Sequence, residues 1–150
     1  MKLIRIITFL LLVFAAACST LKLQPADFAW PVESVLAADN NGTVSEDRYS
    51  IMFDIQGLFY EEFQDSSAYK GKEIRLLRDV NGFYFITSAG FKNVYVFKMD
   101  YGALVLDNKI FVSETGIQSP ALNQRSPYIE LIDNGKSLYL TNTGIYRNKK

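Results

Sequence analysis

The sequence predicts an all-β domain in which an antiparallel meander of about eight to ten strands forms a small sandwich or barrel, with one short helical segment. Short runs of β-branched and aromatic residues recur along the chain, and clusters of Asn, Asp and Gly separate them. The 150 residues, 49% of them hydrophobic, suffice for one domain with a buried core. This length leaves little room for a second domain.

The N-terminal segment has the pattern of an export signal. Lys2 and Arg5 precede a largely apolar run of twelve residues, which ends at Ala17 directly before Cys18. A positive start, a short apolar run and small residues at its end define a secretory signal peptide. A membrane-spanning helix needs about 20 residues. We therefore expect residues 1–17 to be a signal peptide and not a transmembrane anchor.

The end of this segment, Ala15-Ala16-Ala17-Cys18, resembles the lipobox of bacterial lipoproteins. In that family a peptidase cuts before the cysteine, whose sulfur and new amino group are then acylated, so the resemblance implies palmitate-type lipidation of Cys18. The family usually has Leu at the position of Ala15, and Ala15-x-Ala17 also suits an ordinary signal peptidase. A lone thiol is a liability in an oxidising compartment, which favours lipidation. Ser19 stands where Asp would retain such a protein at the inner membrane, which implies the bacterial outer membrane.

The rest of the chain divides into a tether and one domain. Residues 18–31 lack a clear period and contain Pro25 and Pro31, so we expect a lipidated tether, followed by a single all-β domain in residues 32–150. Buried acyl chains contribute about 0.8 kcal/mol per methylene, so the attachment to the membrane is expected to be stable. Loss of Lys2 and Arg5 changes the formal net charge from +0 to −2. This charge argues against nucleic acid as a partner, because nucleic acid requires a basic surface.

Tight-turn sequences separate the strands of the domain, since Asn, Asp and Gly tolerate the positive φ angles of hairpin turns. In Gly57–Gln64 the apolar residues are three and four apart, which predicts a short helix. The expected turns are Asp39–Gly42, Asp79–Gly82, Asp100–Gly102, Asp107–Asn108 and Asp133–Lys136. The strand-forming runs are Tyr49–Ile55, Glu73–Leu77, Phe83–Thr87, Val94–Met99, Ala103–Leu106, Ile110–Ser113, Tyr128–Ile132 and Leu138–Thr141.

Two runs, Phe83–Ile86 and Val94–Phe97, are apolar at every position, so both faces of these strands must be covered. The N-terminal strand and the segment Leu58–Phe63 are the expected covers within the chain. The less covered face is predicted to bind a second copy of the chain or an envelope partner. Tyr84 and Tyr95 are the expected contact residues on that face.

An eight-residue pattern occurs three times, in Tyr84–Phe91, Ile110–Ile117 and Leu138–Ile145. Each copy has an apolar and aromatic start, then Ser or Thr, and a Gly before the last residue, which predicts a strand followed by a turn. The last copy, with Asp133–Lys136 before it, resembles a single blade strand of the YVTN-type β-propellers. A propeller needs at least four blades of about 40 residues, more than the 133 residues after the signal supply. We interpret the repeat as a recurrent strand–turn unit.

The residue types exclude several classes of catalysis. With no His and with Cys18 as its single cysteine, the chain cannot supply a Ser-His-Asp triad, a Cys-His dyad or a usual zinc cluster. A carboxylate-only glycan hydrolase needs two acids facing each other about 5 to 9 Å apart. Glu130 is the candidate acid because it lies inside an apolar run. The simpler explanation for its position is that it lies on the solvent-exposed face of an edge strand. Asp39–Gly42 lacks the later acidic ligand of an EF-hand loop, so no metal or cofactor is expected.

The candidate binding residues lie in one loop and on several strands. Glu114–Ser126 is a thirteen-residue polar stretch between two strong strands, and loops of this length tend to be functional or mobile. Its residues Gln118 and Arg125 are candidate contacts for a polar partner. The tyrosines that are candidates for stacking with a glycan or peptide are Tyr84, Tyr95, Tyr139 and Tyr146.

These observations lead to three hypotheses about function. The first is an envelope-anchored lipoprotein that acts, without catalysis, as a binding or structural module. The second is a carboxylate-only glycan hydrolase, and the third is a carrier of an apolar ligand inside a closed β-barrel. A buried pair of facing acids favours the hydrolase and a continuous apolar cavity favours the carrier, whereas neither feature favours the binding module.

The lipobox hypothesis predicts the effect of Cys18→Ala. This substitution is expected to abolish acylation and to release the domain into the aqueous phase, because a chain without acyl groups lacks their membrane affinity. Incorporation of a radiolabelled fatty acid, together with membrane fractionation, measures both effects. Label that persists in the Cys18→Ala variant would contradict lipidation at this residue.

Overall fold

The computed structural model describes residues 32–147. The expected signal peptide, Cys18 and the tether of residues 18–31 lie outside these described residues. Within residues 32–147 no helix has the length and apolarity needed to cross a membrane. The elements in chain order are β1 (Ser34–Ala37), β2 (Thr43–Glu46), β3 (Ile51–Asp54), α2 (Gln56–Phe63), β4 (Glu73–Arg78), β5 (Phe83–Ser88), β6 (Asn93–Asp100), β7 (Ala103–Phe111), β8 (Pro120–Arg125), β9 (Tyr128–Asp133), β10 (Lys136–Thr141) and β11 (Gly144–Ile145).

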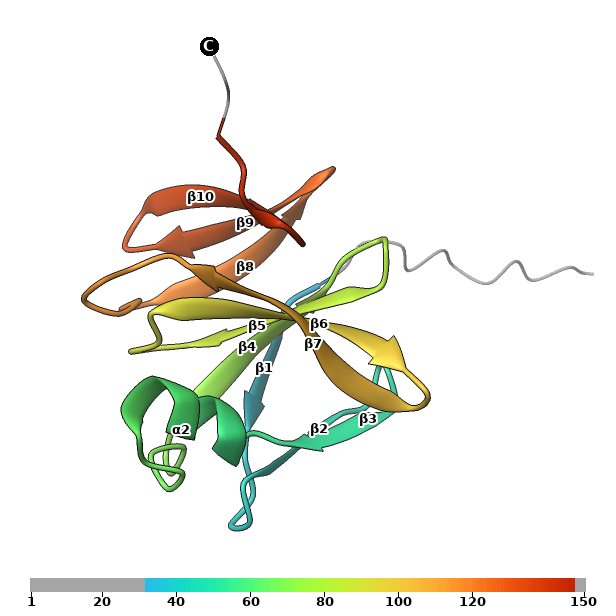
Figure 1. Ribbon diagram of the computed structural model, residues 1–150, viewed down its shortest axis with the longest axis vertical. Coiled ribbons are helices and arrows are strands. Elements are labelled where there is room, and N and C mark those ends of the chain that lie inside the picture. The colour runs from blue at the N-terminus through green and yellow to red at the C-terminus, as the bar shows by residue number, and fades with distance from the viewer. Residues whose placement is uncertain (1–31, 148–150) are drawn as a thin grey trace, which may run out of the picture.

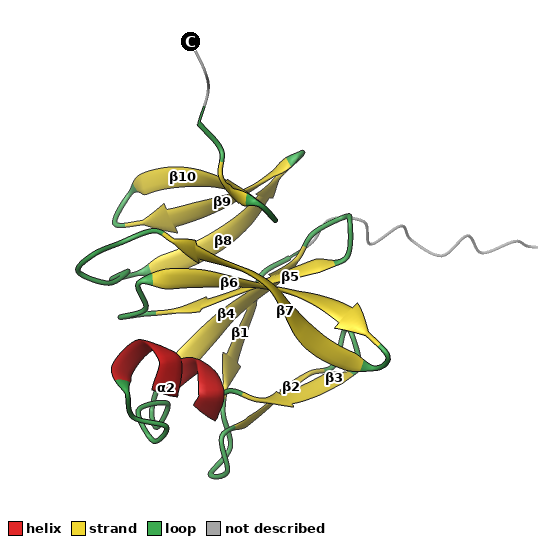
Figure 2. Cartoon of the chain, in the orientation of Figure 1, coloured by secondary structure: helices red, strands yellow, loops and turns green. Residues whose placement is uncertain are grey.

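The described elements stack in three layers (Figure 1). The middle layer is a five-stranded antiparallel sheet of order β1-β4-β5-β6-β7. A four-stranded sheet of order β11-β10-β9-β8 packs on one face, and the β2–β3 hairpin packs with α2 on the other. The prediction of a mostly β, antiparallel domain with one short helix is confirmed (Figure 2). In residues 32–147 the sheets are not closed into a barrel, so the layered arrangement is the correct alternative.

The middle sheet is apolar on both faces because each face belongs to a separate core. Side chains alternate along a strand, so that Phe85 and Val96 enter the core shared with the four-stranded sheet. Ile86 and Tyr95 enter the core beneath α2 and the β2–β3 hairpin. The expectation that strands β5 and β6 are covered twice is therefore confirmed, and both covers come from this chain.

The helix covers the middle sheet mainly with the ring of Phe59. Phe59 of α2 is fully buried, and its ring centroid lies 4.9 Å from that of Phe91 in an edge-to-face arrangement. The helix begins one residue before the predicted range Gly57–Gln64. Its first N–H, that of Gln56, donates to the carboxylate of Asp54 at 2.7 Å. The predicted helical cover is thus confirmed.

The four-stranded sheet contains a strand where the sequence predicted a loop. Residues Pro120–Arg125, the second half of the stretch Glu114–Ser126, form β8 and pair with β9 along their whole length. Leu122 points into the core, whereas Asn123 and Arg125 are exposed. The loop prediction is wrong for these residues. Their side chains alternate between the two faces of the sheet, but the polar composition of the segment indicated a loop.

Strand β7 runs through Asp107 and Asn108, so the predicted turn at these residues is wrong. The pairing of β6 with β7 shifts register between Val96 and Phe97, which makes this site a β-bulge. The Asp107 carboxylate lies 3.3 Å from the Lys98 ammonium, and the Asn108 side-chain amide donates to the Asn142 carbonyl at 3.0 Å. Asp107 and Asn108 therefore lie in a continuous, bulged strand, and their polar side chains make contacts with neighbouring residues.

Glu33 links the two sheets at the start of β1. One of its carboxylate oxygens accepts the backbone N–H of Leu122 on β8 at 2.7 Å. The other accepts a bond from the Arg75 guanidinium on β4 at 3.3 Å. Because β8 is the edge strand of its sheet, this carboxylate also satisfies a donor that would otherwise be available to another strand.

Two glycines of the repeated pattern join the cores. Gly90 and Gly116 both have positive φ angles, 88° and 89°. The Gly90 N–H donates to the Ile117 carbonyl at 2.7 Å, and the Ile117 N–H donates to the Phe91 carbonyl at 2.8 Å. Phe91 belongs to one core and Ile117 to the other. A Cβ atom on Gly116 would lie 2.7 Å from the carbonyl oxygen of Gly90, so a side chain there would force this junction apart.

The junction predicts a large effect of Gly116→Ala. We expect the free energy of unfolding to fall by about 2 to 4 kcal/mol, from backbone strain together with the clash against Gly90. Gly135→Ala is the matched control, because Gly135 has a φ of 76° and open space at its Cβ position. Backbone strain alone should cost the control about 1 to 2 kcal/mol. Urea denaturation measures both values, and equal losses would show that the close approach is unimportant.

Candidate functional site

Tyr84 and Tyr95 are core residues, so the prediction that they form an exposed contact surface is wrong. Their side chains are 4% and 2% exposed, on the face of the middle sheet that packs against α2 and the β2–β3 hairpin. The Tyr84 ring contacts Tyr49 edge-to-face at 5.8 Å between centroids. The apolar area that motivated a homo-oligomer or a partner on this sheet is covered within the chain.

Glu62 of α2 orders the polar atoms around Tyr95. Its carboxylate accepts the Tyr95 hydroxyl at 2.8 Å, the Asn93 side-chain amide at 2.7 Å and the Lys92 backbone N–H at 2.8 Å. Burial, followed by the bond to Glu62, raises the pKa of the Tyr95 hydroxyl. The hydroxyl therefore stays protonated and acts as a structural donor between helix and sheet.

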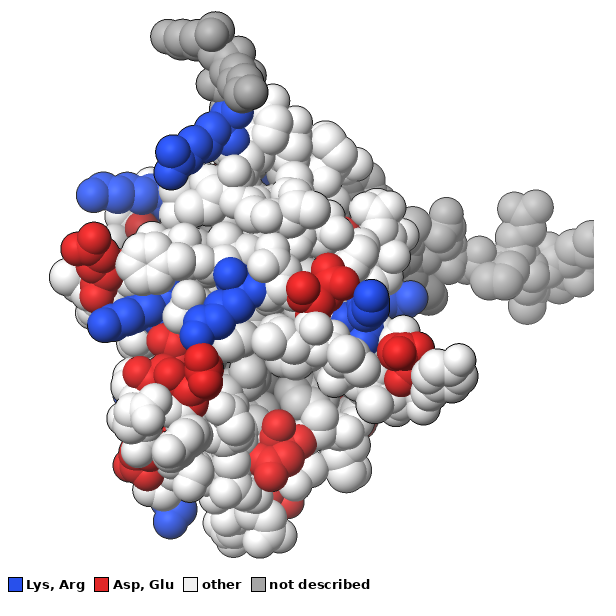
Figure 3. Space-filling view, in the orientation of Figure 1, with Lys and Arg blue, Asp and Glu red and all other residues white. Residues whose placement is uncertain are grey.

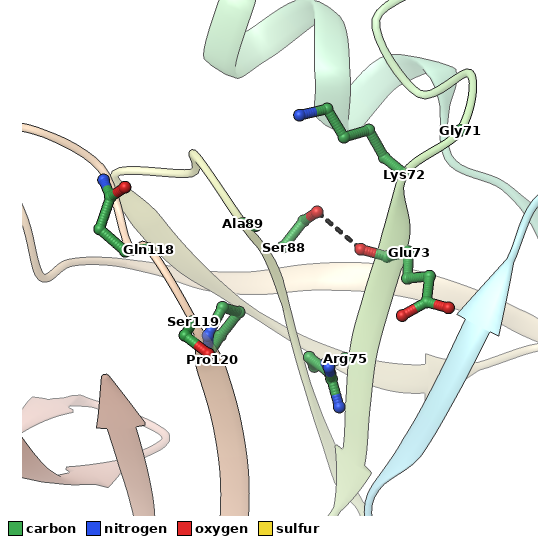
Figure 4. A pocket seen from close by; sticks show the side chains of 9 residues that line it. All are labelled: Gly71, Lys72, Glu73, Arg75, Ser88, Ala89, Gln118, Ser119 and Pro120. Carbon is green, nitrogen blue, oxygen red and sulfur yellow. Dashed lines mark hydrogen bonds between the residues drawn. The ribbon is translucent and has the colours of Figure 1, made fainter. Parts of the chain in front are cut away.

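Gln118 lies where two clefts open at one end of the layered structure. The first cleft has a volume of about 300 Å³ and is lined by β4, the β5–β6 turn and the segment before β8 (Figure 4). Two of its polar side chains are engaged within the fold, since Ser88 donates to the Glu73 carbonyl at 2.7 Å and Arg75 pairs with Glu33. In this view Lys72, Glu73 and Arg75 project in different directions, so they do not converge on a ligand.

The second cleft, of about 400 Å³, lies between the segment after β7 and the β9–β10 hairpin. Asp133 on its wall accepts the backbone N–H groups of Gln118 and Ser119 at 3.0 and 2.8 Å. This carboxylate holds the loop that leads into β8. Gln118 is thus placed by the loop, and it lies at the opposite end of β8 from Arg125.

The outer face of the four-stranded sheet gathers tyrosines and polar side chains. We define the tyrosine face by the outward positions of its strands, which alternate with the buried Leu122, Ile129, Leu131 and Leu140. Tyr139 and Tyr146 are 42% and 41% exposed. The residues of the tyrosine face are Asn123, Arg125, Tyr128, Glu130, Ser137, Tyr139, Thr141 and Tyr146.

Three rings pack together on the tyrosine face. The rings of Tyr128 and Tyr146 are stacked, with centroids 4.2 Å apart and planes at 27°. Tyr139 meets Tyr128 edge-to-face at 6.1 Å. The Tyr146 N–H donates to the Tyr139 carbonyl at 2.7 Å, which fixes the third ring beside the other two. The sequence predicts Tyr139 and Tyr146 as stacking residues but not Tyr128. Tyr128 reaches them only through the pairing of β9 with β10, which local sequence patterns do not specify.

An ion pair lies beside these rings. Glu130 is 7% exposed and accepts the Arg125 Nε–H at 3.0 Å. Hydrogen bonds from Arg125, Ser137 and Asn123 hold the pKa of the Glu130 carboxyl below its ordinary value. The edge-strand explanation for Glu130 is wrong, because β9 lies between β8 and β10. Its carboxylate is buried because donors surround it.

The buried acids of the described chain lack the properties of a hydrolytic pair. These acids are Glu46 and Glu130, and they lie on opposite sides of the middle sheet. Burial alone would raise the pKa of Glu46, but hydrogen bonds from Arg48 and Ser34 hold it below its ordinary value. A general acid needs a raised pKa. Each carboxylate therefore acts as an acceptor for a neighbouring arginine.

Charged side chains of both signs are interspersed on the face of the molecule drawn in Figure 3. Several form pairs, such as Lys109 with Glu61 at 2.6 Å and Lys98 with Asp107 at 3.3 Å. In residues 32–147 no three His, Cys, Asp or Glu side chains gather in a way that would hold a metal ion. The tyrosine face is thus the described surface with the best-defined set of exposed aromatic and polar groups.

Comparison of the chain with protein-family models, with characterised proteins and with solved structures gives no match.

The lowered pKa of Glu130 predicts the pH dependence of stability. The ion pair stabilises the fold above the unfolded-state pKa of about 4.3, and this contribution is lost as the pH falls through the lower pKa of the folded state. Glu130→Gln keeps the shape and removes the charge, so it should unfold more easily at pH 7, by up to about 1 kcal/mol, because solvent screens the mostly exposed Arg125. Urea denaturation between pH 7 and pH 2 should show the two proteins converging at low pH. A constant difference would argue against the ion pair.

Proposed function

We propose that the protein is an envelope-anchored lipoprotein of the bacterial outer membrane, and that it acts without catalysis as a binding module. The acyl chains on Cys18 hold it in the membrane, and the tyrosine face is its binding surface. The observation that carries this proposal is the cluster of Tyr128, Tyr139 and Tyr146 next to the Arg125–Glu130 pair. Rigid aromatic side chains surrounded by polar groups are typical of binding surfaces.

The chemistry of the tyrosine face fits a glycan chain. A sugar ring has apolar C–H faces that stack on aromatic rings, and hydroxyl groups at its edge that require hydrogen-bond partners. The exposed edges of Tyr139 and Tyr146 supply aromatic area. Asn123 and Ser137 donate to Glu130, and their oxygen atoms can still accept hydrogen bonds from sugar hydroxyls. The charges of Arg125 and Glu130 neutralise each other, so the face suits an uncharged ligand.

The alternatives receive less support. A glycan hydrolase requires two facing acids, whereas Glu46 and Glu130 are separated by the middle sheet and paired with arginines. A carrier requires a closed, continuous apolar cavity, whereas the two clefts at Gln118 are open and bordered by charged residues. These contrasts favour a binding module among the hypotheses that the sequence left open.

A flat, exposed face binds a glycan weakly, and the anchor compensates for this weakness. Membrane attachment confines the domain to a thin layer beside the envelope, which raises the effective concentration of the face toward any glycan located there. The lipid anchor and the tyrosine face thus act together. The anchor keeps the face close to envelope glycans, so a modest affinity for them is sufficient.

The glycan proposal predicts the effect of Tyr139→Ala. With a hexamer of β-1,4-linked N-acetylglucosamine as the probe, we expect this variant to bind at least fivefold more weakly, because it removes an exposed stacking ring. Titration followed by NMR chemical shifts measures the affinity, and shifts should concentrate on β8, β9 and β10.

Tyr60→Ala is the matched control, because Tyr60 is a tyrosine of similar exposure, 53%, on α2 at the other side of the middle sheet. Its affinity for the hexamer should equal that of the unsubstituted protein. Equal losses in both variants, or shifts confined to the clefts at Gln118, would contradict the tyrosine face as the glycan site. Self-association through Tyr139 in place of glycan binding would show that the occupant is a second copy.

A further inference from the structure

Exposed apolar side chains gather at the end of the middle sheet where the described chain enters it. Val32 precedes β1, Val80 lies in the β4–β5 turn and Tyr101 lies in the β6–β7 turn. We call this the entry end, and Figure 1 shows the start of β1 and both turns on the same side of the molecule. Tyr101 is 104%, Val80 61% and Val32 59% exposed, which makes them three of the four most exposed large apolar side chains in residues 32–147.

The opposite end of the sheet has a different surface. Its loops, residues 38–42, 64–72 and 112–119, present side chains such as Asn41, Ser67 and Lys70, and their apolar residues are at least partly buried. Phe63 and Phe111 are exposed near this end, but they lie on α2 and β7 and not at loop tips. Apolar turn tips are therefore a feature of the entry end among the described residues.

We propose that the entry end lies against the lipid bilayer, with Tyr101, Val80 and Val32 in contact with its interfacial region. This inference rests on the proposed lipidation of Cys18. Thirteen residues lie between Cys18 and Val32, so the chain can span at most about 50 Å between them. The nine residues of β7 already extend about 30 Å. A chain that reached the membrane from the opposite end would use much of that span to return along the domain, whereas the entry end needs none of it.

The contact is apolar in character. Tyrosine is suited to the interface between water and lipid because its ring is apolar and its hydroxyl is polar. Charges at the entry end are of both signs, and Lys98 is paired with Asp107. Asp79 is occupied by the backbone N–H groups of Asn81 and Phe83 at 2.9 and 2.8 Å. Anionic lipid is therefore not required, and added salt should leave the contact intact.

This orientation leaves the tyrosine face free. The outer face of the four-stranded sheet forms a side of the layered structure, and the entry end lies at the ends of the strands of the middle sheet (Figure 1). With the entry end on the membrane, the strands of the middle sheet rise from the bilayer. The tyrosine face then stands beside the membrane, open to the aqueous phase.

Spin labelling of the full lipidated chain in phosphatidylcholine vesicles tests the proposal. Because Cys18 is the single cysteine and acylation occupies its sulfur, Tyr101→Cys, Val80→Cys and Lys70→Cys each provide one free thiol for a nitroxide. Collision of the nitroxide with a water-soluble nickel complex should fall at least threefold at positions 101 and 80 when lipidated protein in vesicles is compared with the corresponding Cys18→Ala protein in solution. At position 70, at the opposite end, the collision rate should not change.

The outcomes separate this inference from the proposed function. Acylated protein whose labels at positions 101 and 80 collide with nickel as freely as the label at 70 overturns the orientation and leaves the lipoprotein proposal standing. Protein that mass spectrometry finds without acyl groups overturns both. A drop in collisions at 101 and 80 that persists in 0.5 M salt supports an apolar contact with the bilayer.

Discussion

Covering both faces of one sheet is the constraint from which the rest of this structure follows. Strands β5 and β6 are apolar on both sides, and leaving either side in water would expose several large side chains. The chain meets this constraint by placing elements from before the strands, β2, β3 and α2, on one face. Elements from after them, β8 to β11, cover the other. Apart from β1, which lies in the middle sheet, the order of elements along the sequence is thus also their order across the layers.

Hydrogen bonds and ion pairs of buried or partly buried carboxylates hold this arrangement together. Glu33 links the two sheets, Glu62 links α2 to Tyr95, and Asp133 holds the loop before β8. Glu130 and Glu46 are paired with arginines of their own hairpins. Hydrogen bonds hold the pKa values of Glu46 and Glu130 below their ordinary value, which is the opposite of what a general acid needs. On the tyrosine face, the proposed recognition surface, the rings of Tyr139 and Tyr146 extend beyond these internal contacts.

The sequence was sufficient to predict the parts of the fold that depend on local chemistry. Hairpin turns at Asp79–Gly82 and Asp133–Lys136 and the short helix at Phe59 follow from residue types and spacing. The β8 strand and the bulge at Asp107 depend on pairing partners, which local patterns do not specify. The prediction that Tyr84 and Tyr95 form a surface is wrong because alternation along a strand does not specify which of its two faces α2 and the β2–β3 hairpin cover. Of the tyrosine face, the sequence predicts Tyr139, Tyr146 and Arg125 as candidate contacts, whereas Tyr128 and the Glu130 pairing depend on the registers of β8, β9 and β10.

The carboxylate of Glu33 also has a mechanical consequence. It lies next to the point where the described chain begins, and it bonds directly to β8 of the sheet that carries the tyrosines. If a ligand pulls on that sheet while the anchor is fixed, tension along the chain reaches β8 through this side chain as well as through the packed core. Its second oxygen, bonded to Arg75, divides the load with β4. Force would then be shared between two sheets at the place where a single edge strand, β1, would otherwise be peeled away first.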